Sequence, residues 1–182
     1  MNKTRRHVAL IRGINVGRAK RVAMADLRAI VGDLGYGDVR TLLNSGNVVF
    51  TVPASVRTDP ARSIEQGITA RLGISARVTV LTAAELAAAV AENPLGKVAT
   101  DPTRLLVTVL TNPADRKRLL PLARQDWTPE VLAVGRRVAY LWCPKGMLES
   151  RLAQAVSRLL ADAATARNWA TVTKLHALVE SL

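Results

Sequence analysis

Hydrophobic positions in the first 82 residues follow two different patterns. Compact apolar runs at residues 7–12, 39–43, 48–52 and 76–81 predict β-strands, and the middle two flank Asn44-Ser45-Gly46-Asn47, residue types that reverse a chain. At residues 24–34 and 60–72 apolar side chains recur every three or four positions, which indicates amphipathic helices. The order strand, helix, strand, strand, helix, strand predicts a ferredoxin-like βαββαβ unit.

Local signals mark where these helices begin and end. Gly35 and Gly73 stand where the first two helices should stop, and Asp59 before Pro60 is a capping residue at the start of the second. Thr82 with Glu85 three residues later predicts a capping box, which would open a helix over residues 82–93.

The second half of the chain nearly repeats this order. Residues 168–182 predict a C-terminal helix and leave only 164–166 for a short last strand. The other expected elements are strands at 104–111, 131–134 and 138–143, a helix at 113–124, and a long amphipathic helix at 147–161 on Leu148, Leu152, Val156 and Leu159. We therefore predict an α+β fold of two ferredoxin-like subdomains, which a duplication would explain: residues 1–82, a connecting helix and linker over 83–103, and residues 104–182.

Composition narrows the classes of function. The 182 residues include 26 Lys and Arg against 14 Asp and Glu, a formal net charge of +12, which favours polyanions as partners. The abundance of Arg and Ala is also what a GC-rich genome produces regardless of function. One Cys and two His disfavour a disulfide framework and a metal site, and no cofactor is expected. No apolar run reaches spanning length, so we expect a soluble cytoplasmic protein with no membrane partner; its oligomeric state is left open.

Three stretches together resemble a known bacterial family. Residues 8–20 (VALIRGINVGRAK), 42–50 (LLNSGNVVF) and 165–175 (TARNWATVTKL) are similar to the family known as domain of unknown function 1697 (DUF1697). The sequence departs from the family's habit at Arg18, where a second Gly is common, and at Ala170, where Asn usually follows the Trp. The resemblance implies two ferredoxin-like subdomains and no established activity.

The loop after the first strand is the richest candidate for binding. Residues 1–22 contain seven basic side chains and no acidic one. Glycines let a backbone approach a ligand closely, Asn offers a donor and an acceptor, and Arg can clamp a carboxylate or phosphate. The anion-contacting residues expected here are Arg12, Asn15, Gly17, Arg18, Lys20 and Arg21. The spacing matches neither G-x-G-x-x-G nor a P-loop, so a purely structural loop is the alternative.

Two further segments supply candidate side chains. Ser45 and Asn47 in the hairpin could contact a ligand, although turn chemistry alone accounts for both. Arg167 could clamp an anion, although it also precedes Asn168, the expected cap of the terminal helix. Acyl transfer through Ser45 would need His7 or His176 to be delivered by the fold.

Three functions remain open from the sequence. The first, which the charge favours, is a non-catalytic module that binds nucleic acid or another polyanion through the basic loop. The second is an enzyme or binding protein for a small phosphorylated or carboxylated metabolite, held by Arg12, Asn15, Ser45, Asn47 and Arg167. The third is a structural or assembly protein. No catalytic motif decides whether the protein is an enzyme.

Overall fold

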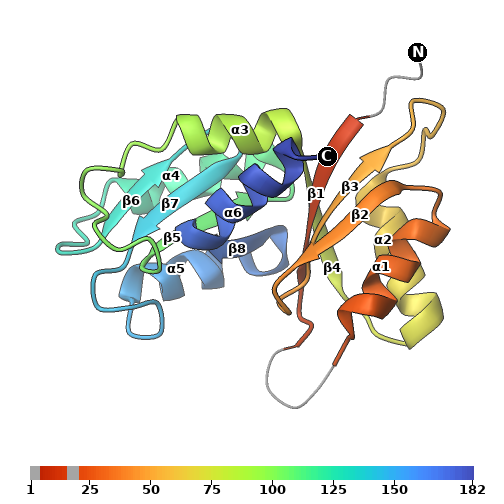
Figure 1. Cartoon of the computed structure of the whole chain (residues 1–182). Helices are drawn as coiled ribbons and strands as arrows, with labels where there is room; N and C mark the ends of the chain where they lie inside the picture. Colours follow the sequence, from red (N-terminus) through yellow and green to blue (C-terminus); the bar gives the residue numbers. More distant parts are fainter. Residues whose placement is uncertain (1–4, 16–20) are drawn as a thin grey trace. The chain divides into compact units, whose positions relative to one another are not determined.

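The computed structural model describes residues 5–15 and 21–182 and divides the chain into two compact units (Figure 1). Unit 1 comprises residues 1–86 together with 175–182, and unit 2 comprises residues 87–174. Each unit contains a four-stranded antiparallel sheet, which confirms the α+β fold.

Unit 1 has the connectivity predicted from the sequence. Its elements are β1 (Arg5–Arg12), α1 (Met24–Asp33), β2 (Gly37–Leu42), β3 (Asn47–Val52), α2 (Pro60–Leu72) and β4 (Arg77–Thr82), followed by α3 (Ala83–Ala91). The strands lie in the order β2-β3-β1-β4, with β1 paired antiparallel to both β3 and β4. This is the ferredoxin-like arrangement, and α1 and α2 lie side by side on one face of the sheet (Figure 1).

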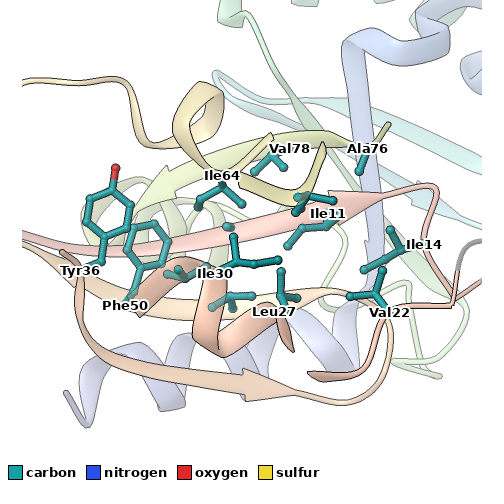
Figure 2. Packing of buried hydrophobic residues seen from close by; sticks show 14 of the residues in the cluster. Ile11, Ile14, Val22, Leu27, Ile30, Tyr36, Phe50, Ile64, Ala76 and Val78 are labelled. Atoms are coloured by element: carbon teal, nitrogen blue, oxygen red, sulfur yellow. The ribbon is translucent and has the colours of Figure 1, made fainter. Parts of the chain in front are cut away.

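The core of unit 1 lies between that sheet face and the two helices. Side chains alternate along a strand, so Ile11 of β1 and Phe50 of β3 meet Leu27 and Ile30 of α1 and Ile64 of α2 (Figure 2). The intervening residues of β1 on the other face are buried as well. Burial on both faces explains why this central strand is a continuous apolar run rather than an alternating one.

Unit 2 repeats the same topology with different lengths. Its elements are β5 (Leu105–Leu110), a 3-10 turn (Pro113–Asp115), α4 (Arg116–Ala123), β6 (Val131–Val134), β7 (Val138–Trp142), α5 (Arg151–Leu160), a second 3-10 turn (Ala161–Ala163) and β8 (Ala164–Asn168). The C-terminal helix α6 (Trp169–Glu180) follows. The strand order β6-β7-β5-β8 is the counterpart of that in unit 1, and Leu119 of α4 and Val156 of α5 pack in the core on one sheet face.

The predicted capping signals are confirmed. Asp59 accepts a hydrogen bond from the backbone N–H of Ala61 at 3.0 Å. Thr82 and Glu85 bond reciprocally, with the Thr82 N–H donating to the Glu85 carboxylate at 2.8 Å and the Glu85 N–H donating to Thr82 Oγ1 at 3.1 Å. The side chain of Asn168 accepts from the N–H of Thr171 at 2.9 Å and so caps α6.

The expected start of the helix over residues 147–161 is wrong. Helix α5 begins at Arg151, and the side chain of Leu148, expected on its apolar stripe, is 95% exposed. Ser150 Oγ accepts from the Ala153 N–H at 2.8 Å and therefore caps the helix three residues later than the periodicity indicates. The local capping bond decides the start, and the apolar spacing of Leu148 with the later residues is coincidental.

Within the described ranges, every helix is too short or too polar to cross a lipid bilayer.

Ala161 gives a direct test of backbone strain at the end of α5. Its φ of 46° and ψ of −117° are angles that Gly adopts easily and other residues do not. We expect Ala161→Gly to raise the free energy of unfolding by about 1 kcal/mol, measured by denaturant unfolding, because the strain is removed and the backbone N–H still donates to Ser157 O. Ala155→Gly inside α5 is the control and should lower it by about 1 kcal/mol. Equal effects of the two changes would contradict this account.

Candidate functional site

The β1–α1 loop and the β2–β3 hairpin meet at one end of the sheet in unit 1. Because Leu10 lies opposite Asn47, the pairing of β1 with β3 ends where the hairpin turns. The N–H of Ile11 donates to the carbonyl of Gly46 at 2.8 Å. We call this region, residues 12–15, 21–23 and 42–47, the junction. The first two family-like sequence stretches thus meet in a single structural feature.

Asn15 closes the base of the loop. Its Oδ1 accepts from the Val22 N–H at 2.8 Å, and its Nδ2 donates to the Val22 carbonyl at 3.0 Å and to the Asn44 carbonyl at 2.7 Å. Asn15 has a φ of 56°, a left-handed conformation that Asn tolerates better than most residues. One side chain therefore ties the two ends of the loop to each other and to the hairpin.

Close packing in the junction requires Gly46. Its φ is +76°, and a Cβ at this position would lie 2.9 Å from Ile14 Cδ1 and 3.1 Å from Ile11 O. A larger residue would push the hairpin away from β1. The glycine of the SGN sequence is thus explained by the close approach of two backbones.

The polar side chains of the hairpin are engaged inside it. Asn47 is fully buried, and its Nδ2 donates to the Leu42 carbonyl at 2.9 Å and to Ser45 Oγ at 2.8 Å. These bonds hold the turn in shape. The proposed ligand-contacting roles of Ser45 and Asn47 stay predictions, and the structure shows a structural role for both.

The fold does not bring His7 to Ser45. His7 lies opposite Phe50 on β1, and the two rings stack with centroids 5.7 Å apart. Leu10, whose partner Asn47 begins β3, is three residues further along β1, roughly 10 Å away. Burial lowers the pKa of His7, and its Nδ1 lies 2.9 Å from the Arg5 carbonyl oxygen. His7 is therefore part of the packing and is not positioned as a base for Ser45.

Two arginines lie opposite each other at this end of the sheet. Arg12 of β1 and Arg77 of β4 are directly paired, so their side chains leave the same sheet face. Arg12 is half-buried and Arg77 is exposed. Like charges directly opposite each other are unfavourable in a sheet. We define Arg12, Arg21 and Arg77 as the cationic set.

Arg21 is included in the cationic set because the bonds between Asn15 and Val22 hold its backbone near the end of β1. It is exposed and precedes Val22, whose backbone is bonded to Asn15 three residues after Arg12. The expected contact residues Gly17, Arg18 and Lys20 lie outside the described residues. Helix α1 begins directly afterwards behind Ala23, whose side chain has no capping group, and its N-terminal dipole adds positive potential, partly offset by Asp26 in the first turn.

Arg77 was missed by sequence reasoning, whereas Arg167 was expected. Arg167 lies on β8 of unit 2 opposite Val107, and its Nη1 donates to the Ala166 carbonyl at 2.8 Å. Burial lowers the pKa of Arg167 to about 10. Its contact with a ligand beside the loop stays a prediction.

Unit 2 contains the equivalent junction without the basic loop. The N–H of Leu110 at the end of β5 donates to the Arg137 carbonyl at 3.0 Å, the counterpart of the bond between Ile11 and Gly46. The chain then passes through Thr111 and Asn112 directly into the first 3-10 turn. The long basic loop is therefore an addition specific to unit 1.

Comparisons with known proteins support the fold and a family. The sequence model described as "Protein of unknown function (DUF1697)" matches residues 4–140. No curated protein matches the chain. A solved structure, that of conserved bacterial protein SP0830 from Streptococcus pneumoniae, is similar with a TM-score of 0.80 and 22% sequence identity, covering 97% of this chain and 99% of that chain. At this identity the similarity shows the fold alone.

Asn15→Gly tests whether this side chain closes the loop. Gly keeps the left-handed backbone, so only the three side-chain bonds are lost, and we expect the free energy of unfolding to fall by about 1–2 kcal/mol. Hydrogen exchange should show faster exchange of the Val22 amide. Asn44→Ala is the control, because the Asn15 bond uses only its backbone oxygen, and its effect should stay within about 0.5 kcal/mol. Unchanged Val22 exchange in Asn15→Gly would contradict the role.

Proposed function

The chain belongs to the DUF1697 family, which is described as of unknown function, so we propose its function from the junction: a non-catalytic protein that binds a polyanion, nucleic acid first of all, through the cationic set. The binding energy comes from phosphates placed against arginines that the fold holds at one end of the sheet in unit 1. Arg18 and Lys20 lie in the same loop sequence and add to the charge.

The opposed pair Arg12 and Arg77 carries this proposal. Two arginine side chains that leave the same sheet face from adjacent strands concentrate positive charge at this end of the sheet. A backbone phosphate beside them would be attracted by both positive charges, with the bidentate geometry that Arg favours. This concentration of positive charge supports a partner that carries phosphates.

The closed loop supports the same conclusion. Since Asn15 fixes both ends of the loop, Arg21 is presented from a backbone that is anchored before any partner binds. Anchoring reduces the conformational entropy lost on binding. Because less entropy is lost, more of the favourable energy of a contact between Arg21 and a phosphate remains as binding free energy.

A small metabolite fits the junction less well. Such ligands are oriented by a few convergent polar side chains, and Asn15, Ser45 and Asn47 were the expected candidates. Their amides and hydroxyl are engaged in holding the loop and the turn. What the junction offers a ligand is mainly positive charge, which favours an extended polyanion over a small, specifically oriented one.

Removing both opposed arginines tests the proposal. The variant Arg12→Gln/Arg77→Gln should bind a fluorescent oligonucleotide more weakly than the wild type, in titrations over a series of salt concentrations. The logarithm of the wild-type binding constant should fall linearly with the logarithm of salt concentration. The slope for the variant should be smaller in magnitude by about 2, one for each lost phosphate contact.

A matched pair at the other end of the sheet separates site from total charge. Arg57→Gln/Arg62→Gln removes the same charge from exposed positions. Arg5 at the start of β1 donates to the Val56 carbonyl at 3.4 Å, which places this segment far from Arg12 at the end of the strand. If both pairs weaken binding equally, general charge and not the junction is responsible, and the proposal fails. Thermal unfolding confirms that each variant is folded.

A further inference from the structure

The tip of the β2–β3 hairpin exposes an apolar side chain at a strained position. Leu43 is 54% exposed and has a φ of 58°, which is unfavourable for a residue with a branched side chain. Exposure and strain both cost free energy, and Gly or Asn at this position would avoid the two costs. Strained residues persist where the surrounding structure enforces them, and they cluster at functional sites.

Three hydrogen bonds to backbone carbonyls of the hairpin hold Leu43 in this conformation. The Leu42 carbonyl accepts from Asn47 Nδ2, the Asn44 carbonyl accepts from Asn15 Nδ2, and the Gly46 carbonyl accepts from the Ile11 N–H. The backbone is thus held on both sides of Leu43. Its side chain is presented to solvent from a fixed turn, so ordering this turn costs little further entropy on binding.

The apolar tip belongs to the same junction as Arg12 and Arg21, and Arg77 lies opposite Arg12 on β4. Asn15 contacts the hairpin at Asn44, directly after Leu43, and the loop it closes contains Arg21. An apolar side chain in the same junction as two of these arginines matches a partner whose charged backbone flanks an apolar interior. Stacked base pairs between two phosphate strands have this distribution.

The aromatic residues argue against a single strand. Proteins that bind single strands stack bases on exposed aromatic rings. All six aromatic residues of this chain lie in the described part, and none is exposed: Tyr36, Phe50, Tyr140 and Trp142 are buried, and Trp127 and Trp169 are half-buried. An aliphatic wedge is instead the kind of side chain that enters a groove and separates base pairs in a duplex.

We propose that the partner is a duplex nucleic acid and that Leu43 is the apolar contact to its base pairs, while the cationic set holds the flanking phosphates. This inference rests on the proposed function and adds the form of the nucleic acid and the residue that recognises it. Leu43 makes no charge contact, so it contributes affinity for paired bases without contributing to the salt dependence.

The test compares Leu43→Asn with wild type on four probes: a short DNA duplex, the RNA duplex of the same sequence, and one strand of each. Asn tolerates the left-handed backbone, so the variant should unfold at the same temperature as the wild type or higher. Its affinity for the preferred duplex should fall about tenfold, while the slope of affinity against salt stays unchanged. Leu148→Asn, at the 95% exposed leucine of unit 2, is the control and should bind like the wild type.

The outcomes separate this inference from the proposed function. The inference is supported if either duplex binds more tightly than the single strands and affinity is lost in Leu43→Asn but not in Leu148→Asn; the better duplex then identifies the nucleic acid. Wild-type affinity of Leu43→Asn for duplex, with loss in Arg12→Gln/Arg77→Gln, overturns the role of Leu43 and leaves the proposed function standing. Tighter binding of a single strand also overturns the inference. Absence of binding to all four probes overturns both.

Discussion

Where a loop and a hairpin meet beyond the end of a sheet, their backbone N–H and C=O groups need hydrogen-bond partners that no strand can supply. In this protein the side-chain amide of Asn15 supplies three of them, to both backbone groups of Val22 and to the carbonyl of Asn44. Gly46 allows the close approach that brings the hairpin to β1. The position of Arg21, the constrained turn around Leu43 and the closure of the basic loop all depend on this set of bonds.

The repeated topology shows how two units with the same scaffold can differ in the arrangement of their charges. Both units have the same strand order, and the bond between the end of the first strand and the hairpin occurs in each. Basic and acidic residues are also divided evenly between the two units, so net charge does not distinguish them. Unit 1 differs by its long loop after β1 and by the opposed Arg12 and Arg77. The arrangement of charge, rather than its amount, sets this end of unit 1 apart.

Features with local causes could be predicted from the sequence, and features with tertiary causes could not. The caps at Asp59 and at Thr82 with Glu85 depend on residues within three positions of each other, and both were predicted. Periodicity failed at Leu148, because it does not register that Ser150 bonds forward to Ala153. The pairing of Arg12 with Arg77 follows from strand register across 65 positions, which no local pattern encodes. The expected strand ending at residue 43 likewise gave no sign of the left-handed turn at Leu43.

The register of β1 against β3 determines both the stability of unit 1 and the position of its arginines. Alternate side chains of β1 enter opposite faces, with Ile11 in the helix-covered core and Arg12 on the other side. A slip of one residue would exchange them, forcing a guanidinium group into the apolar layer and separating Gly46 from the backbone it must approach. Misaligned molecules would therefore lose both their stability and their display of paired positive charge. A cell that removes unstable chains would thereby also remove those in which this pair of arginines is misplaced.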